Sequence, residues 1–235
     1  MKKILLIFVL LISSAFAQVS NNDYFRCVLP EVAKTWQGYT RLAVGAGVSG
    51  LALLVDKPVQ EFMTKKAYLP PVIDAIADSY VDHYWAFAVS ALGAAGKGYQ
   101  TGNYLEPMRY WAVSNVATVA MTYALKYSVG RLRPNGRNHH SYPSGHSSVA
   151  FATATMYQMW YGWKAGIPAY AMATLTAFQR LDDNQHWFSD VIMGATIGII
   201  IPYMFYTGEQ TVKDNQNLIC PPLSVSIPFN FPVGK

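Results

Sequence analysis

The sequence predicts an all-α protein, a helical bundle of about six main helices, and three observations support this. Long apolar or amphipathic segments make up most of the chain. Residues that favour turns separate these segments. Small residues cluster at 45–47, 91–96 and 194–195, where they allow helix backbones to approach closely. The segments expected to be helical are 36–55, 80–96, 105–127, 147–161, 165–178 and 186–206.

Each expected helix is bounded by residues that favour turns or helix caps. The fifth helix is followed by two aspartates, Asp182 and Asp183, which are expected to cap the sixth. The other breaks, in chain order, are Lys57-Pro58, Pro70-Pro71, Gly102-Asn103, Pro134-Asn135-Gly136 and Gly162.

Residues 1–17 are typical of a secretory signal peptide. A basic start is followed by an apolar run at 4–12 and by the small residues Ala15 and Ala17, which suit cleavage. The apolar run is too short to span a bilayer, which disfavours the alternative of an uncleaved anchor. We therefore expect an exported protein of the cell envelope, with its active site facing the periplasm.

The remaining chain is expected to form one helical domain, residues 18–208, and an extended Pro-rich tail, residues 209–235. Export to an oxidising compartment would allow Cys27 and Cys220 to form a disulfide, and two free thiols are the alternative. The net charge of +5 includes no dense run of Lys and Arg, which argues against binding to nucleic acid. We expect a membrane-associated bundle, with a soluble periplasmic bundle as the alternative.

The first candidate functional stretch ends the third expected helix. Lys126 and Arg133 are seven residues apart, so on a continuous helix they would share one face, and Pro134 would stop the helix just beyond them. Two fixed cations on one face suit an anion. The alternative is a basic helix end that the helix dipole favours.

The second stretch precedes the fourth expected helix and contains Ser144, Gly145 and His146. The serine supplies a hydroxyl, the glycine lets backbone N–H groups approach an anion, and the start of a helix attracts negative charge. A histidine there can donate a proton to an oxygen of the same anion. The alternative is a serine cap beside an incidental histidine.

The third stretch runs from Arg180 to Asp190. His186 and Asp190 are four residues apart, so we expect them to share a helix face. The carboxylate would then hold one imidazole nitrogen and leave the other as a nucleophile. The alternative is an ordinary surface pair. Arg131 is expected to point away from the first pair of cations and to be a surface charge.

Together the stretches read Lys-x6-Arg-Pro, Pro-Ser-Gly-His and Arg-x5-His-x3-Asp, in that order. The chain thereby resembles the type-2 phosphatidic acid phosphatase superfamily, which includes bacterial acid phosphatases and vanadium-dependent haloperoxidases. The resemblance covers roughly residues 105–206 and implies the helical fold of that superfamily. It also implies that His186 attacks phosphorus, Asp190 orients it and His146 is the general acid, without a metal or other cofactor. The residues it implies for phosphate binding are Lys126, Arg133, Arg180, Ser144 and Gly145.

One position departs from the family pattern, because Gln179 stands where the family usually has serine before the third-motif arginine. The larger amide puts a phosphate contact from this position in doubt. Asp182 and Asp183 near His186 also allow an alternative in which they bind a metal. Caps between two helices are the commoner role of such aspartates.

The leading functional hypothesis is hydrolysis of a phosphomonoester or pyrophosphate on a lipid carrier: phosphatidate, phosphatidylglycerol phosphate, an undecaprenyl diphosphate or lipid A. A soluble periplasmic acid phosphatase that acts on small phosphate esters is the nearest rival. A vanadium-dependent haloperoxidase and a non-catalytic envelope protein are alternatives of other classes.

Overall fold

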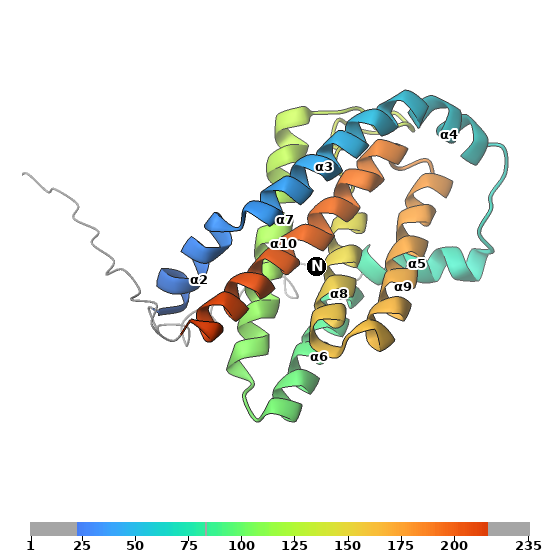
Figure 1. The fold of residues 1–235 in the computed structure, drawn as a ribbon. Helices are drawn as coiled ribbons and strands as arrows, with labels where there is room; N and C mark the ends of the chain where they lie inside the picture. The colour runs from blue at the N-terminus through green and yellow to red at the C-terminus, as the bar shows by residue number, and fades with distance from the viewer. Residues whose placement is uncertain (1–22, 83, 216–235) are drawn as a thin grey trace, which may run out of the picture.

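The computed structural model describes residues 23–82 and 84–215, and their only regular secondary structure is helical, which confirms the all-α prediction. The helices lie side by side in a bundle (Figure 1). In chain order they are α2 (Asp23–Lys34), α3 (Trp36–Ala52), the 3₁₀ helix η1 (Leu53–Val55), α4 (Asp56–Met63), α5 (Pro71–Asp82), α6 (Trp85–Thr101), α7 (Leu105–Val129), α8 (Gly145–Tyr161), α9 (Trp163–Asp182) and α10 (Phe188–Asp214).

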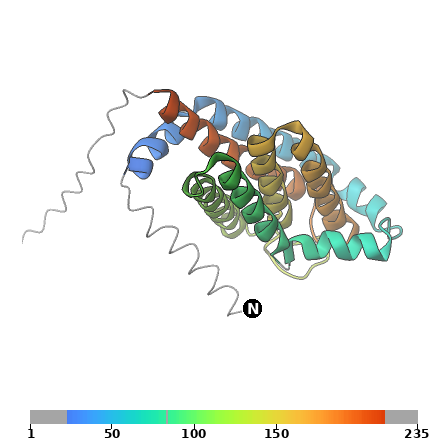
Figure 2. The same cartoon turned by 90° about the horizontal axis from the view of Figure 1, so that it is seen from below.

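Helix α10 lies at the centre, between α3 on one side and α8 on the other (Figure 2). Glycines make the approach of α8 and α10 possible. A Cβ at Gly198 would lie 2.3 Å from the Ser148 carbonyl oxygen, and one at Gly194 would lie 2.5 Å from the Ser144 carbonyl oxygen. Gly194, from the small-residue cluster 194–195, and Gly198 therefore let these two backbones touch.

The core fills the space between α7, α8 and α10. Tyr110 and Trp160 pack edge to face with ring centroids 5.6 Å apart, and Met156 and Ile197 are fully buried beside them. The Tyr110 hydroxyl donates to the Pro202 carbonyl at 3.0 Å, so its polar atom is satisfied inside the core.

All six expected helical regions are helical, but the expected helix 80–96 is wrong as a single element. It is divided between α5 and α6, because Tyr84 adopts a left-handed conformation with φ 61° that no helix can continue through. Helices α2, α4 and most of α5 were not expected. Pro58 was interpreted as a break, yet it lies in the first turn of α4, where proline is tolerated.

Two of the described segments are long and apolar enough to cross a membrane, judged by length and composition alone: Trp36–Met63 and Phe188–Asp214. They differ in their surroundings. Leu51 and Leu54 on the first segment are exposed, whereas most of the second is buried inside the bundle. The first segment therefore offers an outward apolar face, and the second is also the core helix.

Cys27 on α2 is buried and disulfide-bonded. Its expected partner, Cys220, lies outside the described residues, as do the expected signal peptide 1–17 and positions 216–235 of the expected tail. These expectations stay predictions. Helix α10 continues beyond position 208, as far as Asp214.

Candidate active site

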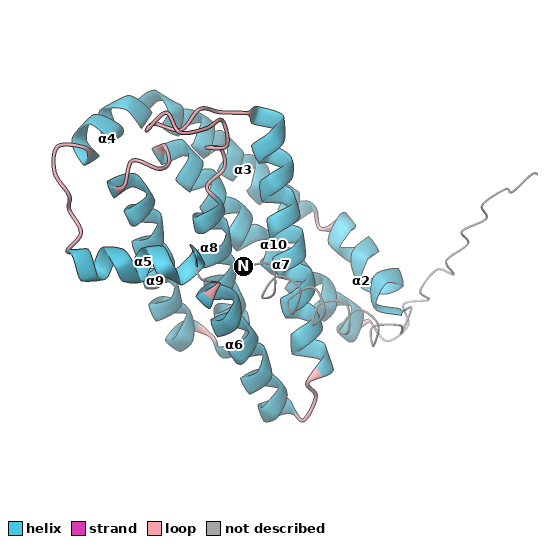
Figure 3. Ribbon diagram, turned by 180° about the vertical axis from the view of Figure 1, so that it is seen from behind, coloured by secondary structure: helices cyan, strands magenta, loops and turns pink. Residues whose placement is uncertain are grey.

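The three candidate stretches meet at one end of the bundle. Helices α7 and α9 end there, and α8 and α10 begin there (Figures 1 and 3). The loop between α7 and α8 and the short connection between α9 and α10 lie together at this end (Figure 3). Polar side chains distant in the sequence are thus brought together, with helix termini around them.

The expectation that Lys126 and Arg133 share a continuous helix is wrong. Helix α7 ends at Gly130, which has a φ of 57° in the left-handed region that glycine adopts at helix ends. The break lies before Pro134. Arg133 therefore belongs to the loop, and only the fold of that loop determines where its side chain lies.

The Lys126 ammonium is buried and holds this loop. Its Nζ donates to the His140 carbonyl at 2.7 Å and to the Pro143 carbonyl at 2.8 Å. Burial, together with the nearby charge of Arg133, lowers the pKa of Lys126 to about 8. The ammonium is thus mostly charged at neutral pH, and a buried anion would stabilise that charge.

Arg133 reaches across the site to the connection before α10. Its Nε donates to Asn138 at 3.1 Å, and its guanidinium donates to the Gln185 carbonyl at 3.2 Å, next to His186. Burial first, and then the charge of Arg180, lowers the pKa of Arg133. The cations of the first and third stretches are therefore near enough to interact.

Ser144 is the N-cap of α8, as its alternative interpretation proposed. Its buried hydroxyl accepts from the Ser147 N–H at 3.4 Å, and its own N–H donates to the Asp190 carbonyl at 2.9 Å. The space beside Gly145 is open, because an added Cβ would meet only Thr122, at 3.9 Å. A ligand could approach the backbone there without displacing protein atoms.

His146 is half-buried and faces two groups from other helices. Its Nε2 lies 2.6 Å from a carboxylate oxygen of Asp82 and 3.3 Å from the Arg180 guanidinium. Arg180 also pairs with Asp78, one helical turn before Asp82 on α5. The general acid and the arginine that the resemblance implies therefore lie side by side, under the carboxylates of α5.

Asp78 and Asp82 were not expected at the site. The signal was present, because Asp74, Asp78 and Asp82 recur every four residues and so share one face of α5. Ligand atoms of Asp78, Asp82 and His146 lie within 4.8 Å of one another, which makes them a set that could hold a metal ion. The guanidinium already neutralises one of these carboxylates.

Asp182 was expected to cap the sixth helix, and this is wrong. Its carboxylate accepts from the backbone N–H groups of Tyr68 and Leu69, each at 3.0 Å, and so holds the connection that precedes α5. Asp183 accepts from the Gln179 amide at 2.7 Å. Within the described residues, the groups suited to a metal do not include either aspartate.

His186 and Asp190 are close, but for a different reason from the expected one. Helix α10 begins at Phe188, so His186 precedes the helix and does not share a face with Asp190. The carboxylate instead turns back over the helix start, accepts from the Trp187 N–H at 2.9 Å and lies 3.6 Å from His186 Nδ1. That separation is an electrostatic contact, longer than a hydrogen bond.

The His186 imidazole is neutral at physiological pH. Burial lowers its pKa from 6.5 to about 4, and the charges of Arg133 and Lys126 act in the same direction against the opposing effect of Asp190. A neutral imidazole keeps the nitrogen lone pair that a nucleophile needs.

The expectation that Arg131 is a surface charge is also wrong. Its guanidinium donates to Asp190 at 2.8 Å, to Asp56 at 2.7 Å and to the Ser189 hydroxyl at 2.6 Å. Asp56 in turn accepts from the Ser189 N–H at 2.8 Å. Arg131 therefore neutralises two buried carboxylates and ties α4 to the start of α10.

Gln179 has a clear structural role. It is fully buried, its amide nitrogen donates to Asp74 at 2.9 Å, and its amide oxygen accepts from Arg180 Nε. The residue in place of the family serine therefore orients the neighbouring arginine from the side.

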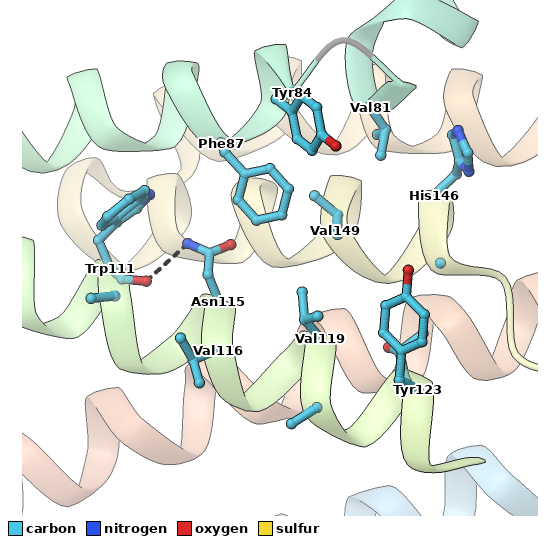
Figure 4. Close-up of a pocket in the computed structure, with 14 residues that line it drawn as sticks. Val81, Tyr84, Phe87, Trp111, Asn115, Val116, Val119, Tyr123, His146 and Val149 are labelled. Atoms are coloured by element: carbon cyan, nitrogen blue, oxygen red, sulfur yellow. Dashed lines mark hydrogen bonds between the residues drawn. The ribbon is translucent and has the colours of Figure 1, made fainter. Parts of the chain in front are cut away.

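An apolar groove of about 580 Å³ leads to this site. It runs between α6, α7 and α8, with Trp111 towards one end and His146 at the other (Figure 4). Gly145 also lines it. Val116 and Tyr123 on its rim are exposed, so the groove is open along α7. An elongated apolar group could lie in it with a polar end beside His146.

The part of the chain that carries the three stretches matches a known protein family. Residues 108–214, which contain all three stretches, match the model of the PAP2 superfamily. This part of the chain therefore resembles a PAP2 domain. The match confirms the resemblance to the type-2 phosphatidic acid phosphatases inferred from the three motifs.

The PAP2 domain is similar to two curated proteins. Over 89 residues the chain is 44% identical to the lipid A 1-phosphatase of Porphyromonas gingivalis, covering 37% of this chain and 20% of that protein. Over 105 residues it is 30% identical to the lipid A 4'-phosphatase of Helicobacter pylori, covering 40% of this chain and 53% of that one. The chain thus spans a fifth and about half of the lengths of these relatives.

A solved structure, the transmembrane PAP2-type phosphatidylglycerolphosphate phosphatase of Bacillus subtilis, also resembles the chain. The match has a TM-score of 0.47 and 18% identity, and covers 86% of this chain and 96% of the other.

The lowered pKa of His186 predicts how the stability of the PAP2 domain depends on pH. Between pH 6.5 and about 4 the unfolded chain binds a proton that the folded protein excludes, so the free energy of unfolding falls as the pH falls through this range. We expect a loss of up to about 3 kcal/mol from this residue. Denaturant unfolding at pH 7 and pH 4.5 measures it. His186→Asn should show a shallower loss, and an equal loss in both proteins would contradict the prediction.

Proposed function

We propose that this chain is a phosphatase that removes phosphate from a phosphorylated lipid by way of a phosphohistidine on His186. One observation carries the proposal. A buried, neutral imidazole lies where it is influenced by the charges of Lys126 and Arg133, at the same end of the bundle as His146 and Arg180. Cations around a neutral nucleophile suit attack on an anionic phosphate.

In the proposed first step, His186 Nε2 attacks phosphorus and the bond to the leaving oxygen breaks. His146 gives its proton to that oxygen. Lys126, Arg133 and Arg180 would hold the phosphate oxygens and offset their charge, with the Ser144 hydroxyl and the Gly145 N–H beside them. The buried Ser144 hydroxyl already accepts a hydrogen bond as the cap of α8, so contact with phosphate would require it to form a second hydrogen bond.

In the second step, water attacks the phosphohistidine, the bond from nitrogen to phosphorus breaks, and His146 takes the proton of the water. Asp190 would orient the imidazole through Nδ1 in both steps, and its 3.6 Å contact would shorten as positive charge develops on the ring. No step requires a metal ion.

A lipid substrate is supported by the groove and by the relatives. The groove is lined mainly by apolar side chains and reaches His146, so an acyl chain could lie in it while the phosphate enters the cationic site. The two similar proteins are lipid A phosphatases. The outward apolar face of Trp36–Met63 supports membrane association. That the site faces the periplasm is part of the proposal and follows from the expected export signal.

A phosphate-release panel tests the proposal. The purified full chain in detergent would be given lipid A, phosphatidate, a polyprenyl diphosphate and soluble p-nitrophenyl phosphate, each with and without a chelator. We expect release from at least one lipid, undiminished by the chelator and blocked by vanadate. Release from the soluble ester alone would indicate an acid phosphatase. A requirement for divalent metal would instead assign His146 to the metal set with Asp78 and Asp82.

A further inference from the structure

The apolar groove contains a buried polar side chain that the proposed chemistry does not use. Asn115 projects from α7 into the groove, between Trp111 and Val119 (Figure 4). It is 4% exposed, whereas its groove neighbour Val116, the next residue, is exposed. An amide in this position needs hydrogen-bond partners, because burial separates it from bulk water.

Only part of the Asn115 amide is satisfied within the described structure. Its nitrogen donates to the Trp111 carbonyl at 2.8 Å, while its oxygen has no hydrogen-bond partner. The carbonyl can only accept, so the nitrogen must face it and the oxygen must point the other way. Figure 4 shows the oxygen turned away from Trp111. The unpartnered atom is therefore an acceptor.

The position of Asn115 relative to the phosphate site follows from the helix geometry. Thr122 lies seven residues further along α7, and its methyl group is the nearest atom to the open side of Gly145. A rise of 1.5 Å per residue places the acceptor roughly 10 Å along the groove from the phosphate site. A lipid chain that begins at the phosphate would cover this distance with its first several atoms.

We propose that Asn115 is a recognition site for a hydrogen-bond donor, a hydroxyl or an amide N–H, on the chain of the lipid substrate. A purely hydrocarbon chain would fill the groove and leave the Asn115 oxygen buried without a partner. A chain with a donor near this position would satisfy it. The inference rests on the proposed function and adds a substrate class, lipid phosphates with a donor close to the head group.

The test compares three synthetic long-chain phosphate monoesters of equal length: a plain chain, a chain with a hydroxyl about 10 Å from phosphorus, and a chain with an amide there. For the wild-type protein we expect kcat/KM to be about three- to tenfold higher for a donor-bearing chain than for the plain chain. Whichever chain is favoured identifies the donor. In Asn115→Leu the ratio should fall to about one.

Two controls separate recognition from damage to the groove. Val119→Ala also alters the lining but removes no polar atom, so it should change all three rates by similar factors and keep their ratio. Asn115→Ala replaces Asn115→Leu if the leucine variant fails to fold. Equal rates in the wild type, or a preference that persists without Asn115, would overturn the inference.

The inference and the proposed function fail in different ways. If the wild type releases phosphate from the plain chain but shows no preference, only the inference fails. If nothing is hydrolysed, the proposed function fails, and equilibrium binding of the three lipids to His186→Ala still tests Asn115. A binding ratio near one would then overturn the inference as well.

Discussion

His186→Ala should lower kcat/KM for phosphate release by at least about 10⁴-fold, because the variant has no atom that can accept the phosphoryl group. Cations and the groove would still bind substrate, so KM should change far less than kcat. Steady-state phosphate release with the lipid that the wild type hydrolyses best measures both constants. Trapping of labelled phosphate on the wild-type protein in samples denatured at alkaline pH, where the N–P bond survives, and its absence in the variant, would identify the phosphohistidine.

His139→Ala is the matched control for this loss. His139 is exposed in the loop before α8, and its Nδ1 lies 3.3 Å from the Gly130 carbonyl. His139→Ala should leave kcat/KM within about threefold of the wild-type value. If His186→Ala folds as the wild type does and keeps more than a tenth of its activity, the proposed nucleophile is wrong.

Arg131→Met should reduce the free energy of unfolding by about 3–5 kcal/mol, the usual cost of removing one partner from a buried ion pair. Both Asp56 and Asp190 are buried, and both lose their guanidinium partner in this variant. Thermal and denaturant unfolding in one mild detergent measure the change. Activity should fall as well, because Asp190 would no longer be held beside His186.

Arg137→Met provides the comparison for Arg131. Arg137 lies in the same loop but is exposed, so removing its charge should change the free energy of unfolding by less than about 0.5 kcal/mol. Arg131→Lys keeps the positive charge but lacks the planar guanidinium that donates to both carboxylates. Its loss in the free energy of unfolding should therefore lie between those of Arg131→Met and Arg137→Met. A loss for Arg131→Met no larger than that for Arg137→Met would show that Arg131 is the surface charge the sequence suggested.

The sequence by itself determined where the main helices lie and which residues belong to the PAP2 motifs. Apolar periodicity and turn residues are local properties, so they located the helical regions of α3 and of α6 to α10. The three motifs are short runs of contiguous residues, so their recognition required no knowledge of the fold. The apolar pattern did not predict the break between α5 and α6, because that break depends on the left-handed conformation of one residue, Tyr84.

Only the tertiary structure decided how charges are paired at the site. Gly130 ends α7 and redirects the chain, so the spacing of Lys126 and Arg133 did not predict where Arg133 lies. Arg131 meets Asp56, a residue 75 positions earlier, and His146 meets Asp82, 64 positions earlier. Each partner is near in space and remote in sequence, so no spacing rule along the chain can specify it, and for the buried Asp56 the charge depends on that partner.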